Sequence, residues 1–281
     1  MRQHVLEHRD LAAFRRSLQV RERSQATVEK YLREAEAFLQ TLRPGQAVTK
    51  ELVLAWKAAL ARRYAVSTVN GKLAALNGLF AFLGWRDCQV APLRRQRTLF
   101  RDQRQELTRQ EYLRLVEAAH AQGKERLALL LETICATGIR VSELPYITVE
   151  AALRGRAEIA LKGKVRTILL PRKLCQRLKK YARKRAIPAG GIFRTRSGRP
   201  LDRKNIWAEM KQLSRQAGVE GSKVFPHNLR HLFARCFYSA TRDVAQLADV
   251  LGHSSIETTR IYLRTTGAEH VKTLEKLRLI P

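Results

Sequence analysis

Two arginines, two histidines and a tyrosine in the second half of the chain are residue types that together can transfer a phosphoryl group. They are Arg140, His227, Arg230, His253 and Tyr262. Two guanidinium groups suit a phosphate, because each offers planar, paired donors to its non-bridging oxygens. Histidine moves protons near neutral pH, and a tyrosine hydroxyl can attack phosphorus. The set therefore predicts phosphoryl transfer through a protein-linked intermediate, which needs neither a metal nor a nucleotide cofactor.

The densest motif is Pro226–His231, with the sequence PHNLRH. Proline favours the first turn of a helix, so His227 and Arg230, three residues apart, share one helix face. A helix N-terminus adds free backbone donors and a favourable dipole for an anion. The motif therefore predicts that both side chains address one phosphate.

Each of these residues also has an ordinary structural explanation when it is taken alone. Arg140 can simply pair with Glu143, and a histidine after a helix-ending glycine, such as His253, is commonly a capping or buried residue. Tyr262 lies among apolar neighbours, where a tyrosine usually packs in a core. The combination outweighs these explanations, because the motifs occur in one order and at restrictive spacings within one basic domain.

In order and wording, the motifs resemble those of the tyrosine recombinases, the integrase and Xer group of site-specific DNA recombinases. Residues 136–144 (ATGIRVSEL) are similar to the first arginine box of that family, and residues 227–231 (HNLRH) to its His-x-Leu-Arg-His box. Residues 251–253 (LGH), followed by Tyr262, are similar to its third box and nucleophile. The resemblance implies a mainly α fold, in which a helical core-binding domain precedes a mostly helical catalytic domain with a small β-hairpin.

The resemblance also implies a reaction, in which DNA is cut and rejoined at specific sites. Arg140 and Arg230 would clamp the scissile phosphate and stabilise its developing charge. Tyr262 would attack it and form a 3′-phosphotyrosyl link with a free 5′-hydroxyl. His227 and His253 would assist proton transfer and hold the non-bridging oxygens. No cofactor or metal is implied, because the phosphotyrosyl ester retains the energy for rejoining and the arginines replace a metal.

Three further residues are implicated by the same resemblance. Glu143 would orient an arginine or histidine of the site without contacting the phosphate itself. The general acid of the family is a hairpin lysine, which here is Lys162 or Lys164. The family's Gly-Lys-Gly run aligns best on Lys162, although Ala160 and Leu161 stand where a glycine is common.

The charge of the chain agrees with a polyanionic partner. Its 281 residues include 54 Lys and Arg against 25 Asp and Glu, a formal net charge of +29. Such an excess repels itself unless a phosphate backbone neutralises it. We therefore expect double-stranded DNA as the partner. The resemblance adds inverted half-sites, with a homo-oligomer that places a dimer on each site and a tetramer in the synapse.

Two other functions fit parts of this pattern. A type IB topoisomerase shares the chemistry but only relaxes supercoils. The sequences of the motifs in this chain resemble those of the Xer and integrase recombinases instead. A DNA-binding protein that has lost catalysis would need a geometric defect, because every candidate catalytic group is present.

The sequence also favours a cytoplasmic, nucleoid-associated protein with no membrane partner. No apolar run approaches the roughly 18 residues of a membrane-spanning helix, and no signal-peptide pattern is present. The four cysteines, Cys88, Cys135, Cys175 and Cys236, have no paired spacing. This argues against zinc sites and disulfides and predicts buried thiols in a reducing compartment.

Composition and periodicity divide the chain into three parts. We expect a helical, SAM-like DNA-binding domain over residues 1–95, a polar cationic linker over 96–105 and the catalytic domain over 106–281. The expected helices of the first part begin at Ser24 (to about Leu42), Thr49 and Ser67. Those of the last part begin at Thr108, near Leu127 and at Arg172, Asp202, Pro226, Asp243, Ser255 and Ala268, and residues 157–161 and 165–170 form a hairpin.

Overall fold

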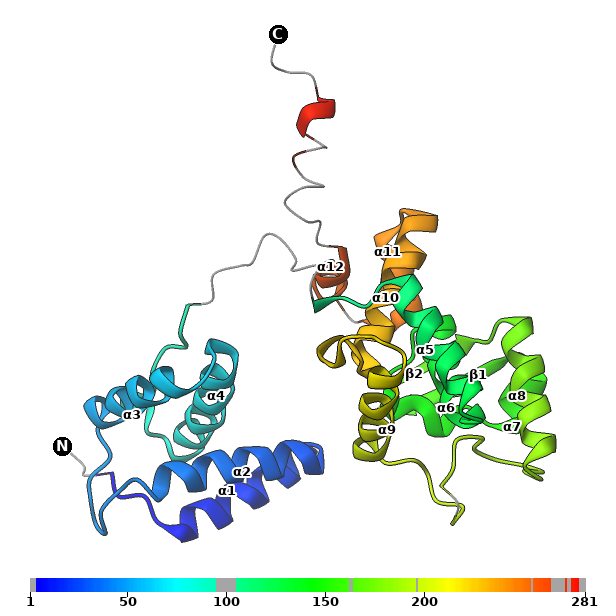
Figure 1. The fold of residues 1–281 in the computed structure, drawn as a ribbon. Helices are drawn as coiled ribbons and strands as arrows, with labels where there is room; N and C mark the ends of the chain where they lie inside the picture. The colour runs from blue at the N-terminus through cyan, green and yellow to red at the C-terminus, as the bar shows by residue number, and fades with distance from the viewer. Residues whose placement is uncertain are drawn as a thin grey trace. The chain divides into compact units, whose positions relative to one another are not determined.

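The structure is a computed structural model that describes residues 4–94, 105–161, 164–195, 197–253, 255–263, 271 and 274–277. The chain divides into two compact units, Met1–Arg97 (unit 1) and Thr98–Pro281 (unit 2). Figure 1 shows that both consist mainly of helices and that unit 2 contains a small sheet of two strands. The mainly α fold is therefore confirmed. Of the expected linker, 96–105, only Gln105 is among the described residues.

Unit 1 is a helical bundle. Its described helices are α1 (His8–Val20), α2 (Gln25–Leu39), α3 (Lys50–Arg63), α4 (Val66–Leu83) and the short 3-10 helix η1 (Arg86–Cys88). The apolar faces of these helices form its core, in which Phe14, Phe38 and Phe80 are at most 1% exposed. The rings of Phe38 and Phe80 meet edge to face, with centroids 6.0 Å apart.

Helix ends in unit 1 follow local capping where the sequence provides it. Thr49 begins α3 as predicted, because its hydroxyl accepts a hydrogen bond from the amide of Leu52. Gly84 ends α4 in the left-handed region, at φ 79°. Two predicted boundaries are wrong: α2 ends at Leu39 instead of about Leu42, and α4 begins at Val66, before Ser67.

Two basic side chains of unit 1 have partners within it. Lys72 pairs with the buried carboxylate of Glu34, and Lys57 donates to the carbonyl of Ala91 at 2.7 Å. Burial raises the pKa of Glu34, but hydrogen bonds from Lys72 and Arg33 outweigh it, so the net pKa is lowered. Lys72 therefore stabilises the bundle instead of forming part of a free basic face.

Unit 2 contains the remaining elements. They are α5 (Arg109–Ala121), α6 (Glu125–Thr137), η3 (Val141–Tyr146), α7 (Val149–Arg154), β1 (Arg156–Leu161), β2 (Lys164–Leu169), α8 (Arg172–Lys184), α9 (Arg203–Gln216), η4 (Gly221–Lys223), α10 (Pro226–Thr241), α11 (Val244–Leu251), α12 (Ile256–Arg260) and η5 (Ile261–Leu263). Helix α6 is central and packs against α5, α8 and α10 (Figure 1). Strands β1 and β2 are antiparallel, with Leu161 opposite Lys164.

Local signals predicted the helix starts of unit 2 well. Thr108 and Glu111 form the expected capping box of α5, and Asp202, Asp243 and Ser255 each accept a backbone hydrogen bond at the start of a helix. Pro226 occupies the first turn of α10. The last predicted helix was expected to begin at Ala268, which lies outside the described residues.

Two polar contacts fix loops around this core. The amide of Asn228, which is buried, donates to the carbonyls of Gln105 and Lys223 at 2.9 and 2.7 Å. The carboxylate of Glu150 accepts from the backbone amide of Gly190 at 3.0 Å, and this bond, followed by one from Thr148, lowers the pKa of Glu150 to about 2.

The cysteines depart in part from expectation. Cys88 and Cys175 are buried, but Cys135 is intermediate and Cys236 is exposed on α10. The prediction of buried thiols is therefore wrong for Cys236, which borders a surface pocket beside Cys135 of α6. Among the described helices, none combines the length and apolar character needed to cross a membrane.

Candidate active site

A cavity of about 570 Å³ in unit 2 brings together five residues that the sequence singled out. They are Arg140, His227, Arg230, His253 and Tyr262. These residues come from segments more than a hundred positions apart along the chain. Further lining comes from the first two turns of α9, through Arg203 and Trp207. The predicted constellation is thus assembled in space.

The end of helix α6 positions Arg140. Gly138 stops the helix at φ 63°, and a Cβ there would lie 2.3 Å from the ring of Phe233, so only glycine fits. The chain then turns into η3, where the backbone amide of Arg140 and its Nη1 both donate to Glu143, at 2.7 and 3.0 Å. Glu143 is 3% exposed, whereas the Arg140 side chain is 42% exposed. The buried carboxylate thus holds one edge of a guanidinium that borders the cavity.

Helix α10 carries Arg230 into the protein interior. Although only 2% exposed, its guanidinium donates to the carbonyls of Gly138 and Leu251 and approaches Nε2 of His253 at 2.9 Å. Burial and the positive charge of Arg140 lower the pKa of Arg230, while Tyr262 acts in the opposite direction. The carbonyls fix the cation rigidly at the cavity wall.

The hydrogen bonds of His253 define its tautomer. A guanidinium has no acceptor, so Nε2 of His253 must accept from Arg230. Nδ1 therefore carries the proton and donates to the hydroxyl of Thr259, a fully buried residue, at 2.9 Å. Burial, followed by the charges of Arg230 and Arg140, lowers the pKa of His253 to about 4. His253 is thus a neutral imidazole at pH 7.

Tyr262 packs against three histidines. The centroid of its ring lies 4.4 Å from that of His231, which it meets edge to face, and 5.7 Å from that of His253, on which it stacks. The centroid of the His227 ring is 6.2 Å away. Tyr262 is 6% exposed but borders the cavity. The pKa of His227 is lowered by burial and then by Arg230 and Arg140, so this histidine also favours its neutral form.

His231 is the residue of this cluster that the sequence analysis did not assign to the site. Burial, followed by the neighbouring His227, lowers its pKa to about 3. It stands in the same HNLRH motif, four residues after His227, so helical spacing already placed both on one face. That spacing was the available signal.

The hairpin lysines cannot be placed. Lys162 lies outside the described residues, and for Lys164 the backbone alone is described. The hairpin itself is attached to the segment that carries Arg140, because the hydroxyl of Tyr146 in η3 donates to the carbonyl of Ala160 in β1 at 2.9 Å. The structure thus joins β1 to η3.

Candidate metal ligands meet in unit 1, whereas the cavity belongs to unit 2. Within the described residues, His4, Asp87 and Cys88 have ligand atoms within 4.8 Å of one another. Protein groups already engage them: His4 pairs with Asp87 at 3.1 Å, and the thiol of Cys88 donates to the carbonyl of Val48. The cluster therefore has an ordinary structural explanation.

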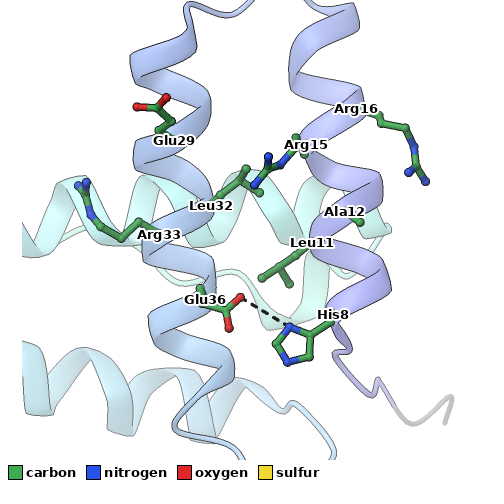
Figure 2. Close-up of a pocket in the computed structure, with 9 residues that line it drawn as sticks. All are labelled: His8, Leu11, Ala12, Arg15, Arg16, Glu29, Leu32, Arg33 and Glu36. Atoms are coloured by element: carbon green, nitrogen blue, oxygen red, sulfur yellow. Dashed lines mark ion pairs between the residues drawn. The ribbon is translucent and has the colours of Figure 1, made fainter.

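Unit 1 also has a groove of about 560 Å³ between α1 and α2. Figure 2 shows His8 and Glu36 facing each other across it, with nitrogen and oxygen 3.7 Å apart, and Leu11 and Leu32 between the two helices. None of the predicted catalytic residues lines this groove. Its mixed charge and apolar base distinguish it from the cationic cavity of unit 2.

Comparison with known proteins agrees with this geometry. The phage integrase family matches residues 105–269, and the SAM-like N-terminal domain of phage integrases matches residues 11–87. Tyrosine recombinase XerA of Pyrococcus furiosus is 30% identical over 288 residues, which cover 100% of this chain and 98% of that protein. Tyrosine recombinase XerC of Roseiflexus castenholzii is 34% identical over 233 residues, 76% of this chain and 74% of that protein.

Solved structures share the fold. A lambda integrase dimer bound to a COC′ core site matches with a TM-score of 0.74 at 19% identity, covering 92% of this chain and 95% of that one. The crystal structure of XerA recombinase matches with a TM-score of 0.53 at 22% identity, covering 97% and 99%.

The chain belongs to the phage integrase family, the tyrosine recombinases. It is a site-specific recombinase, an enzyme that cleaves and rejoins DNA.

Proposed function

We propose that Tyr262 attacks the scissile phosphate of DNA in this cavity and forms a 3′-phosphotyrosyl intermediate. The observation that carries the proposal is the convergence of Tyr262 with two arginines and two histidines on one cavity. The Tyr262 oxygen forms a bond to phosphorus as the bond from phosphorus to the 5′-oxygen breaks. Rejoining reverses these steps with a 5′-hydroxyl as the nucleophile, so the ester retains the energy and no ATP is consumed.

The two arginines act as the phosphate clamp. Arg230 is held by backbone carbonyls and Arg140 by Glu143, so neither cation must reorganise when charge develops on the phosphate oxygens. Fixed cations in a partly buried cavity stabilise such charge more than solvated ones do. Each guanidinium keeps part of its donor set for the phosphate.

Proton transfer is divided between the histidines and a hairpin lysine. A neutral His227 can accept the proton that Tyr262 loses, and the lowered pKa of His227 keeps it neutral at pH 7. His253 borders the same cavity and can hold a non-bridging oxygen once the phosphate engages Arg230, provided that its proton moves to Nε2, which then donates to that oxygen. The departing 5′-oxygen takes its proton from Lys162, with Lys164 as the alternative.

We further propose that the partner is double-stranded DNA with inverted half-sites, bound by a dimer on each site and a tetramer in the synapse. The net charge of +29 supports a DNA partner. The similar lambda integrase has been solved as a dimer on a core site and as a tetramer on a Holliday junction. In this proposal residues 1–95 bind the duplex, residues 106–281 carry out catalysis, and residues 96–105 form the linker between these two domains. The enzyme works in the cytoplasm, at the nucleoid.

Replacement of Tyr262 by phenylalanine tests the proposed nucleophile. The variant keeps the ring that packs against His231, so we expect normal DNA affinity and no covalent adduct on a nicked half-site substrate. Tyr238→Phe is the matched control, because Tyr238 packs in the same apolar cluster but does not line the cavity, and it should form adduct at the normal rate. An adduct that survives in Tyr262→Phe would refute the assignment.

A pair of activity assays addresses the two other functions. The enzyme should recombine two sites on one plasmid. Relaxation of supercoils without recombination would indicate topoisomerase activity, and neither activity would indicate a DNA-binding protein that has lost catalysis.

A further inference from the structure

Arg166, on strand β2, joins the segments that carry Arg140 and His253. Its Nη2 donates to Oε2 of Glu143 at 2.6 Å, and its Nη1 donates to the carbonyl of Val250 at 3.2 Å. The side chain is 16% exposed and does not line the cavity. It therefore touches the supports of the site while remaining outside the cavity itself.

The contact with Glu143 determines how that carboxylate is shared. Oε2 of Glu143 accepts from both Arg166 and the backbone amide of Arg140, whereas Oε1 accepts from the Arg140 side chain. One buried negative charge thus faces two guanidinium groups. Without Arg166, the full charge of Glu143 would act on Arg140 and compete with a phosphate for it.

The contact with Val250 fixes the end of α11. The last carbonyls of a helix lack intrahelical partners and favour cations. Here Arg166 takes the carbonyl of Val250, and Arg230 takes that of Leu251. The turn that follows places His253, so the two guanidiniums together set its position.

The backbone of the same turn packs directly against Arg166. Gly252 has φ 63°, and a Cβ on it would lie 2.5 Å from Cδ and 2.6 Å from Nη1 of Arg166. Within the described part of the chain, the Nε of Arg166 is buried without a hydrogen-bond partner. Because an unpaired buried donor is unfavourable, its presence indicates that the hydrogen bonds of the two terminal nitrogens determine the orientation of the guanidinium.

We propose that Arg166 is a positioning residue for strand cleavage, which shares Glu143 with Arg140 and clamps the end of α11 so that both Arg140 and His253 keep their places. The proposal rests on the proposed roles of Arg140 and His253. It adds a mechanical link between the hairpin strand and the segment that precedes Tyr262.

Single-turnover cleavage of a nicked half-site at saturating protein tests the link. Arg166→Ala should cleave about 10–100-fold more slowly, as expected for a displacement of about 1 Å in a catalytic group, with DNA affinity within about twofold of normal. Arg156→Ala is the matched control, because this arginine of the same hairpin pairs at the surface with Glu158. It should cleave at the normal rate.

Two further measurements separate positioning from a general loss of structure. Arg166→Lys keeps the charge but has one nitrogen for two acceptors, so we expect partial recovery of the cleavage rate. In a Glu143→Gln background, Arg166→Ala should slow cleavage less than in the natural protein, because the shared carboxylate is already gone and only the bond to Val250 remains to be lost. Methylguanidinium added to Arg166→Ala should restore part of the rate.

Normal cleavage by a folded Arg166→Ala would overturn the proposal, as would a defect confined to DNA affinity. If Arg166→Ala does not fold, Arg166→Lys decides: a reduced saturated rate supports the proposal, and a normal rate refutes it. The adduct assay on Tyr262→Phe is independent of these outcomes, so failure of the proposed nucleophile is distinguishable from failure of the link.

Discussion

Replacement of Gly252 by alanine should damage catalysis more than stability alone explains. The residue has φ 63°, where an L-amino acid pays about 1–2 kcal/mol relative to glycine. The new Cβ would also press on Arg166, which must move and lose its bond to the carbonyl of Val250. Loss of a hydrogen bond to a charged group adds about 1.5–3 kcal/mol.

Gly155→Ala supplies the matched control. Gly155 ends α7 at φ 73°, and a Cβ there would meet nothing within 4 Å. It therefore carries the backbone cost without the clash, and its Tm should fall by about 2–8 °C, given about 2–4 °C per kcal/mol for a domain of this size. Gly252→Ala carries both costs and should lose about two and a half times as much stability.

The decisive readout is the rate of single-turnover cleavage, measured at least 15 °C below the lower Tm. We expect Gly155→Ala to cleave normally and Gly252→Ala to cleave about 10–100-fold more slowly. The double variant Gly252→Ala, Arg166→Ala lacks the clash, so its loss of stability should be smaller than the sum of the losses in the two single variants. Equal rates for the two glycine variants, or strictly additive stability losses, would refute the reasoning.

Three other predictions follow from contacts described above, and a fourth follows from the proposed general acid. Asn228→Ala leaves two carbonyls without their buried donor and should lower the free energy of unfolding in urea by about 1–3 kcal/mol, whereas an unchanged value would contradict the contact. Because the pKa of His231 falls from 6.5 to about 3 on folding, the unfolded chain binds more protons between these values and stability rises with pH across that window. His231→Gln should flatten this slope, and an identical slope would argue against the burial. The pKa of Glu150 falls from 4.5 to about 2 on folding, so its stabilising effect is complete above pH 4.5 and is lost as the pH falls toward 2. Glu150→Gln should remove this part of the loss of stability in acid, and an unaltered dependence of stability on pH would contradict the prediction. Lys162→Ala should slow cleavage by about 10²–10⁴-fold on ordinary DNA but recover on a substrate with sulfur at the bridging 5′-position, and rescue of Lys164→Ala in its place would transfer the role of general acid.

Most helices could be predicted from the sequence because their starts carry local chemistry. The hydroxyls of Thr49 and Thr108 and the carboxylate of Asp243 accept backbone hydrogen bonds within three residues, so the signal is readable in a short window. Helix α1 lacked such a signal. Its capping box pairs Glu7 with Asp10, an uncommon choice of residues for those positions.

The candidate site could be predicted as a set of residues but not as a set of contacts. Arg140, Arg230 and Tyr262 stand in motifs, and the cavity does bring them together. The bond from Arg166 to Val250 joins positions 84 residues apart, and no periodicity in the chain reports it. The same holds for the tautomer of His253, which depends on how three separate segments converge.

Separate apolar cores in the two units make the enzyme modular in the evolutionary sense. The core around Phe38 and Phe80 and the core around α6 have no residue in common. Substitutions that accumulate in one therefore need no compensating change in the packing of the other. All five candidate residues of the cavity belong to unit 2, so selection on the core of unit 1 can act separately from selection on the packing that holds them.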